Sequence, residues 1–72
     1  MISKKYIKDL GFKTIEDLFN YIVESEINGN YSQCKELLNK LSSSQFKDYL
    51  NYLKDFNDNV QVEKALKYRL EV

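Results

Sequence analysis

The sequence contains no histidine, proline or tryptophan, and its 72 residues include one cysteine and two glycines. Zinc and haem are held mostly by histidine and cysteine, so the usual ligand sets for these groups cannot be assembled. One cysteine cannot form a disulfide within the chain, and no histidine is present to activate it as a nucleophile. The composition therefore predicts a protein that is not an enzyme and that binds no metal or cofactor.

An excess of charge of one sign is also missing, because eleven basic residues balance eleven acidic ones. Without a whole-molecule field, neither nucleic acid nor an anionic membrane is the expected partner. The charge is nevertheless segregated along the chain. Residues 1–13 hold four lysines and one aspartate, a net charge of +3, whereas residues 14–36 hold five acids and one lysine, a net charge of −4. We expect these two segments to attract each other.

Long apolar runs are absent. The longest, Tyr21 to Val23, is far shorter than the roughly 20 residues needed to span a bilayer. The lysines near the start of the sequence are not followed by the apolar stretch of a secretory signal. A chain with one thiol suits a reducing compartment. We therefore expect a cytoplasmic protein with no membrane partner.

Helix start and stop signals divide the chain into short segments. Gly11 and Gly29 each follow an apolar-periodic segment, where helices commonly end in a residue that tolerates a left-handed conformation. Four residue pairs match a helix cap, in which a short polar side chain stands three positions before a polar or acidic one. The pairs are Thr14 with Asp17, Asn30 with Gln33, Ser42 with Gln45, and Asp58 with Gln61.

Between these signals, apolar residues recur at spacings of three and four, as in helices that are buried on one side. No segment alternates with period two, so no strands are expected. A short helix over about residues 3–10 would offer Ile2, Tyr6 and Leu10. The other expected stripes are Ile15, Leu18, Phe19, Ile22 and Val23; Tyr31, Cys34, Leu37, Leu38 and Leu41; Phe46, Tyr49, Leu50, Leu53 and Phe56, with Tyr52 at the edge; and Val62, Ala65 and Leu66.

These patterns predict an all-α fold, a single helical domain over residues 1–72 made of four to five short helices. The expected connections are two to five residues long, which favours antiparallel neighbours. We expect two helical hairpins, about residues 14–41 and 43–70, with the first helix packed against them.

Residues 29–41, with the pattern G-N-Y-x-x-C-x-x-L-L-x-x-L, resemble the turn and second helix of a tetratricopeptide repeat. In that family a small residue, here Cys34, lets the two helices approach closely. Ile22 stands where the family prefers a small residue, and no second copy follows about 34 residues on. The resemblance implies one isolated helical hairpin, because a repeat array needs stacked neighbours.

Residues 24–50 also resemble a stretch found in short, mostly uncharacterised helical proteins of tailed bacteriophages. Most of the shared residues are caps or expected core positions, so the resemblance implies a fold and a phage origin. It implies no catalytic residue. The shared residues are Glu24, Ser25, Ile27, Asn28, Gly29, Ser32, Gln33, Leu37, Leu41, Ser42, Gln45 and Phe46.

The groups that could carry chemistry have simpler structural explanations. Cys34 lies on an apolar stripe without a basic cluster to lower its pKa, so we expect a buried, unreactive thiol. Glu16 and Asp17 fall in the first turn of an expected helix, where the helix dipole favours acids.

Glu26 and Arg69 each fall on the apolar face of an expected helix, and two interpretations stay open. In the first, both side chains lie at helix ends and extend to water. In the second, they pair with each other across the domain, or one of them points into a partner interface.

Two further features suggest surfaces for a partner. Tyr21 and Tyr52 lie at the margins of apolar stripes, and tyrosine is enriched where proteins bind one another. Lys4, Lys5 and Lys8 surround an aromatic residue, an arrangement that can contact phosphates, although three lysines on one helix are more often a solvated face.

The leading functional hypothesis is a protein-binding module. It would be a small phage-type accessory protein that docks on a host or phage protein and inhibits or redirects it, in the host cytoplasm if phage-encoded. The candidate binding residues are Tyr21, Tyr52, Glu26 and Arg69. One alternative is a nucleic-acid-binding regulator that uses Lys4, Lys5 and Lys8. Another is a homodimeric structural or assembly protein, since a short chain rich in leucine and aromatic residues can leave apolar area uncovered.

Overall fold

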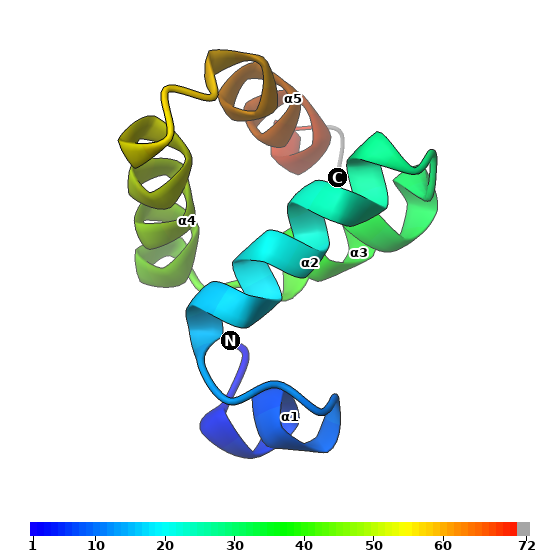
Figure 1. Ribbon diagram of the computed structural model, residues 1–72, viewed down its shortest axis with the longest axis vertical. Helices are drawn as coiled ribbons and strands as arrows, with labels where there is room; N and C mark the ends of the chain where they lie inside the picture. The colour runs from blue at the N-terminus through cyan, green and yellow to red at the C-terminus, as the bar shows by residue number, and fades with distance from the viewer. Residues whose placement is uncertain (71–72) are drawn as a thin grey trace.

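The computed structural model describes residues 1–70, and these residues form five helices and no strand. The helices are α1 (Lys4–Asp9), α2 (Ile15–Ile27), α3 (Tyr31–Lys40), α4 (Ser43–Asp55) and α5 (Asn59–Leu70). The all-α prediction is confirmed. Helices α2 and α3 form one hairpin and α4 and α5 the other, and α3 also packs on α5 (Figure 1). Helix α1 lies at one end of the molecule and the α4–α5 turn at the opposite end.

Most helix starts follow the cap signals. Thr14 and Asp17 form a complete capping box at α2, and Ser42 and Gln45 form another at α4. Asp58 accepts a hydrogen bond from the Gln61 backbone N–H, 3.2 Å away, at the start of α5. The prediction for Asn30 is wrong, because its side chain makes no capping hydrogen bond at α3.

Three helices end in the same backbone motif, which is why the chain turns sharply after each. Gly11 and Gly29 have φ of +90° and +83° after α1 and α2, as the glycine signals predicted. Asn57 takes the same left-handed conformation after α4, with φ of +56°. At this third turn, the Asp58 N–H donates to the Leu53 carbonyl and the Asn57 N–H to the Lys54 carbonyl, which is a Schellman motif.

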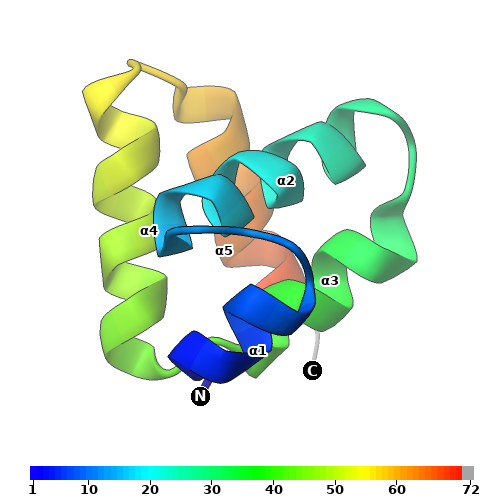
Figure 2. The same ribbon diagram turned by 60° about the horizontal axis from the view of Figure 1, so that its bottom comes forward.

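The core lies where the two hairpins and α1 meet (Figure 2). The periodicity correctly predicted most of it, including Leu18, Ile22, Leu38 and Leu53, which are fully buried. Phe19 packs edge-on against Tyr49, with ring centroids 5.2 Å apart, and so joins α2 to α4. Buried apolar area of this kind is the main stabilising term in a domain this small.

Four residues that were expected in the core are instead exposed. They are Leu10, Tyr31, Phe56 and Leu66. The first three stand at or just beyond helix ends, where no neighbouring helix reaches far enough to cover them. Leu66 lies toward the solvent side of α5. In α1 the buried residue is Ile7, which the spacing of four missed.

Gln45 fixes the start of the chain to the rest of the fold. Its side-chain amide accepts a hydrogen bond from the Ile2 N–H at 3.0 Å and donates to the Ile2 carbonyl at 2.6 Å. The same amide oxygen also accepts from the Ser42 N–H at the start of α4. One side chain therefore caps α4 and positions the segment that leads into α1.

Candidate protein-binding surfaces

Glu26, a candidate binding residue, is almost completely buried and is satisfied within the fold. Only 4% of it is exposed. Its carboxylate accepts hydrogen bonds from Gln61 Nε2 at 2.9 Å and from Lys64 Nζ at 2.6 Å, and the Tyr68 hydroxyl lies 3.5 Å away. All three donors come from α5. Glu26 therefore neither extends to water nor faces a partner, and it attaches the end of α2 to α5.

Opposing effects set the ionisation of Glu26. Burial raises the pKa of its carboxyl, but the hydrogen bonds from Gln61 and Lys64 and the Lys64 charge outweigh burial, so the pKa is lower than its ordinary value. Glu26 lies in the last turn of α2, where the helix dipole disfavours an acid and α2 has no basic residue of its own. Lys64 supplies the missing positive charge from α5.

Arg69 does not pair with Glu26. Its Nη1 donates hydrogen bonds to the carbonyl oxygens of Leu38 and Leu41, at 2.5 Å and 2.9 Å, at the end of α3. The guanidinium also lies 4.6 Å from the centre of the Phe46 ring. Arg69 thus provides positive charge to the C-terminus of one helix and packs on an aromatic residue of another. These contacts engage Arg69 within the fold.

Tyr21 is also used within the fold. Its hydroxyl accepts a hydrogen bond from Gln33 Nε2 at 2.7 Å, and its ring lies 5.4 Å from that of Phe12. The Gln33 side chain that was expected to cap α3 therefore joins α3 to α2. The half-buried Tyr21 covers the core between α2 and the loop that follows α1.

Tyr52 belongs to an aromatic row that runs out of the core to the surface. Its ring lies 5.6 Å from that of Phe19 on one side and 5.0 Å from that of Phe56 on the other. Phe19 is buried, Tyr52 is half-buried and Phe56 is 68% exposed. Phe56 is held by an edge-on contact with Tyr52, so a large apolar side chain is presented to solvent from a well-packed support.

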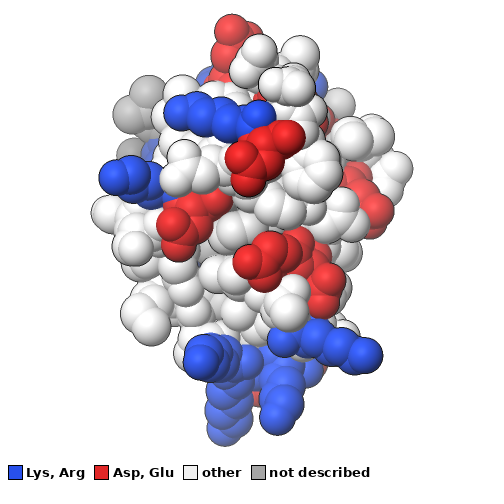
Figure 3. All heavy atoms as spheres, turned by 60° about the vertical axis from the view of Figure 1, so that its left-hand side comes forward, with Lys and Arg blue, Asp and Glu red and all other residues white. Residues whose placement is uncertain are grey.

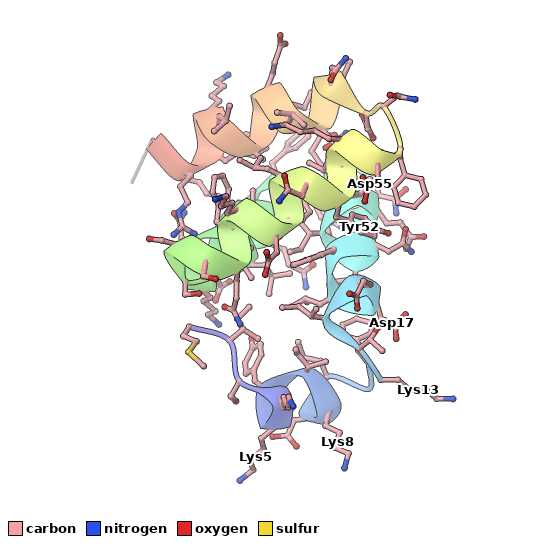
Figure 4. The ribbon with its side chains drawn as sticks, turned by 90° about the vertical axis from the view of Figure 1, so that its left-hand side faces the viewer. Lys5, Lys8, Lys13, Asp17, Tyr52 and Asp55 are labelled. Carbon is pink, nitrogen blue, oxygen red and sulfur yellow. The ribbon has the colours of Figure 1, made fainter. Side chains whose placement is uncertain are left out.

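Acidic side chains flank this row. Asp48 and Asp55 are exposed and share a face of α4 with Tyr52, at helical spacings of four and three. Within residues 1–70 neither carboxylate makes an ion pair or a hydrogen bond. Asp17 of α2 lies on the same side of the molecule (Figure 4). Asp48, Tyr52, Asp55 and Phe56 are called the aromatic–acidic surface below.

Four lysines, Lys4, Lys5, Lys8 and Lys13, gather at the opposite end. Figure 3 shows lysine side chains grouped at the α1 end, below a face that carries most of the acidic side chains in view. Lys5, Lys8 and Lys13 extend into solvent there (Figure 4). The expected attraction between the basic and acidic segments is not expressed as ion pairs. Within residues 1–70, the ammonium groups of Lys4, Lys5, Lys8 and Lys13 make none, although the Lys13 backbone N–H donates to the Asp17 carboxylate at 3.2 Å.

A groove of about 820 Å³ opens among these lysines. Ile2, Ile7 and Ile15 contribute to its mainly apolar wall, and Gln45 also lines it. Lys4, Lys5, Lys8 and Lys13 also line it. This feature is called the lysine groove below. The sequence showed the lysines but not the groove, because the groove needs α1, the start of α2 and Gln45 to come together.

Chemical reactivity is not favoured at the one thiol. Burial, and secondarily the Glu26 charge, raises the pKa of Cys34 to about 11, so the unreactive thiol form predominates at neutral pH. Within residues 1–70 no group of three or more acidic, cysteine or histidine side chains is arranged to hold a metal ion. None of the described helices is long and apolar enough to span a bilayer.

Comparisons of the chain with protein families, with curated proteins and with solved structures gave no match.

Proposed function

We propose that the protein is a non-enzymatic binding module that attaches to another protein through the aromatic–acidic surface. The observation that supports this most directly is Phe56, which is 68% exposed and supported from beneath by Tyr52. An exposed aromatic residue on a rigid base contributes much contact area at little cost in side-chain entropy. Of the candidate residues, Tyr52 stays in this proposal, whereas Tyr21, Glu26 and Arg69 are engaged within the fold.

The chemistry of the surface favours a basic partner. Asp48 and Asp55 flank the aromatic residues without partners of their own among residues 1–70. A partner segment that carries lysine or arginine beside an apolar pocket would neutralise both acids and cover Phe56. Complementary charge of this kind speeds association and selects the partner. The physiological setting that we propose is that of a phage-type accessory protein, which docks on a host or phage protein in the host cytoplasm and inhibits or redirects it.

Affinity capture with matched variants tests this proposal. The bait is the wild type, Phe56→Ser or Ile27→Ser, used in a lysate of the cells in which the protein is naturally made. Ile27 is the control because it is 67% exposed, almost the same as Phe56, but lies at the end of α2. A partner retained by the wild type and by Ile27→Ser, and lost with Phe56→Ser, is the expected result. A partner that all three retain equally would refute the surface, and no specific partner would refute the function.

A nucleic-acid-binding role is the second candidate, because Lys4, Lys5 and Lys8 present unpaired charge at one end of the molecule. Three phosphate contacts predict that the logarithm of affinity falls with the logarithm of salt concentration with a slope of about −2.7. Fluorescence titration of duplex DNA at several salt concentrations measures that slope. An affinity that does not change when the three lysines are replaced by glutamine would eliminate this role.

A further inference from the structure

We propose that the lysine groove receives the aromatic–acidic surface of a second copy of this chain, so that copies associate head to tail. The inference rests on the proposed function, because it assigns a partner to the same aromatic–acidic surface. It also assigns a role to the groove, which that function leaves unused.

The two surfaces are complementary in shape and polarity. The groove is a mainly apolar depression of about 820 Å³, which is larger than a phenylalanine side chain needs. Phe56 is a projecting apolar side chain on the other surface. Ile2 and Ile7 are already buried, so Phe56 would pack mainly on the partly exposed Ile15 and on the aliphatic parts of the lysines that line the groove. This contact would remove apolar area from water on both sides, which favours association.

The two surfaces are also complementary in charge. Lysines line the groove, Asp55 directly precedes Phe56, and Asp48 lies about two helical turns before Phe56 on α4. None of these six charged groups makes an ion pair within residues 1–70. Docking would bring the acids to the lysines while Phe56 fills the groove. The zero net charge of the whole chain removes the long-range repulsion that usually keeps identical molecules apart.

The positions of the surfaces determine the kind of assembly. The groove lies at the α1 end and Phe56 lies at the α4–α5 turn, which Figure 1 places at opposite ends of the molecule. One chain therefore cannot fill its own groove. A docked pair still offers one free groove and one free Phe56, so the contact is heterologous and can continue into a chain or a ring rather than ending at a symmetric dimer.

Sedimentation velocity of the wild type tests self-association directly. At about 10 mM ionic strength, where the screening length is about 30 Å, the sedimentation coefficient should rise with protein concentration. The apparent affinity of self-association should be at least about tenfold lower at about 0.2 M salt. A wild type that remains monomeric up to about 1 mM at low salt would overturn the inference. That result would leave a Phe56-dependent capture of another protein standing, so the two proposals fail separately.

Charge-reversed variants identify the surfaces. Lys5→Glu/Lys8→Glu impairs the groove and keeps the aromatic–acidic surface, whereas Asp48→Lys/Asp55→Lys does the reverse. Each variant alone should be monomeric, and an equimolar mixture should form a dimer that grows no further. All four residues are exposed and none caps a helix, so the fold should be kept, which circular dichroism checks. If either variant alone associates like the wild type, the assigned surfaces are wrong.

A matched control separates specific docking from simple attraction between oppositely charged variants. Adding Phe56→Ser to Lys5→Glu/Lys8→Glu leaves its net charge at −4, starting from zero in the wild type, and removes only the apolar anchor. Mixed with Asp48→Lys/Asp55→Lys, this triple variant should form at least about tenfold less dimer than its parent. Equal amounts of dimer would show that net charge alone drives the mixture, and would overturn the insertion of Phe56.

Discussion

Replacing the buried carboxylate of Glu26 with an amide should destabilise the fold more than most substitutions of a single polar side chain do. Glu26→Gln keeps the side-chain volume but leaves one acceptor oxygen where Gln61 Nε2 and Lys64 Nζ now both donate, at 2.9 Å and 2.6 Å. The charge that strengthens both hydrogen bonds would be lost, and Gln61 would stay bonded only if its amide turned to accept from the new N–H group. Hydrogen bonds to a charged group contribute about 1.5–3 kcal/mol each. Lys64 recovers part of its loss because 43% of its side chain is exposed to water.

The expected net loss is about 2 kcal/mol at neutral pH, which corresponds to a fall of about 8–16 °C in Tm for a domain of this length. Urea unfolding followed by circular dichroism measures the difference. Glu24→Gln is the control, because Glu24 lies on the same helix, has the same charge and is exposed.

The dependence on pH gives a second, independent check. The pKa of Glu26 is lowered from its ordinary value of 4.5 in the folded state. Ionised Glu26 therefore stabilises the fold fully above about pH 4.5, and the contribution disappears as the pH falls through the lower folded-state pKa. The gap between the wild type and Glu26→Gln should narrow at about pH 3. Two results would contradict the reasoning: a loss within about 0.5 kcal/mol of that for Glu24→Gln, or a gap that is the same at both pH values.

Three further predictions follow from other parts of the fold. Arg69→Gln should lower the free energy of unfolding by about 1–3 kcal/mol, because the hydrogen bonds to the Leu38 and Leu41 carbonyls are lost. Its effect should add to that of Glu26→Gln within about 0.5 kcal/mol, and a larger coupling in the double-mutant cycle would show that the two residues do interact. Gly29→Ala should cost about 1–2 kcal/mol from backbone strain alone, since φ is +83° and a Cβ would meet no atom within 4 Å, and an unchanged urea midpoint would contradict that conformation. Cys34 should react with a thiol reagent at neutral pH only as fast as the protein opens, so stabilising conditions should slow the reaction, and rapid labelling of the native protein would contradict its burial.

The residues that were misjudged from sequence share a cause. Phe56 and Tyr31 have the spacing of core residues, but each stands at a helix end, where spacing alone does not show whether another helix reaches it. Asn30 stands in a cap position, yet its partner Gln33 is drawn to Tyr21 on the neighbouring helix. For Phe56 and Tyr31 a covering helix is absent, and for Gln33 a contact with another helix is present. In each case a distant segment overrode the local pattern.

The surfaces were only partly foreseeable for the same reason. Tyr52 was visible as a stripe margin and the lysines as a cluster, but the exposure of Phe56 and the existence of the groove were not. Nothing in the sequence indicated that Lys64 neutralises Glu26, because a lysine in a helix with an irregular apolar pattern is usually a solvent-exposed residue without a buried partner. Pairing it with Glu26 requires knowing that α5 crosses the end of α2.

The sequence by itself determined the all-α class, two of the three left-handed helix ends, three of the four expected caps and most of the buried positions. These depend on groups three to five residues apart, whose hydrogen bonds and relative directions follow from helix geometry alone. Only the tertiary structure decided that Glu26 meets Lys64, that Arg69 binds the end of α3, and that an apolar groove opens among the lysines. Those features join segments tens of residues apart, and their energies depend on how the helices cross rather than on any local pattern.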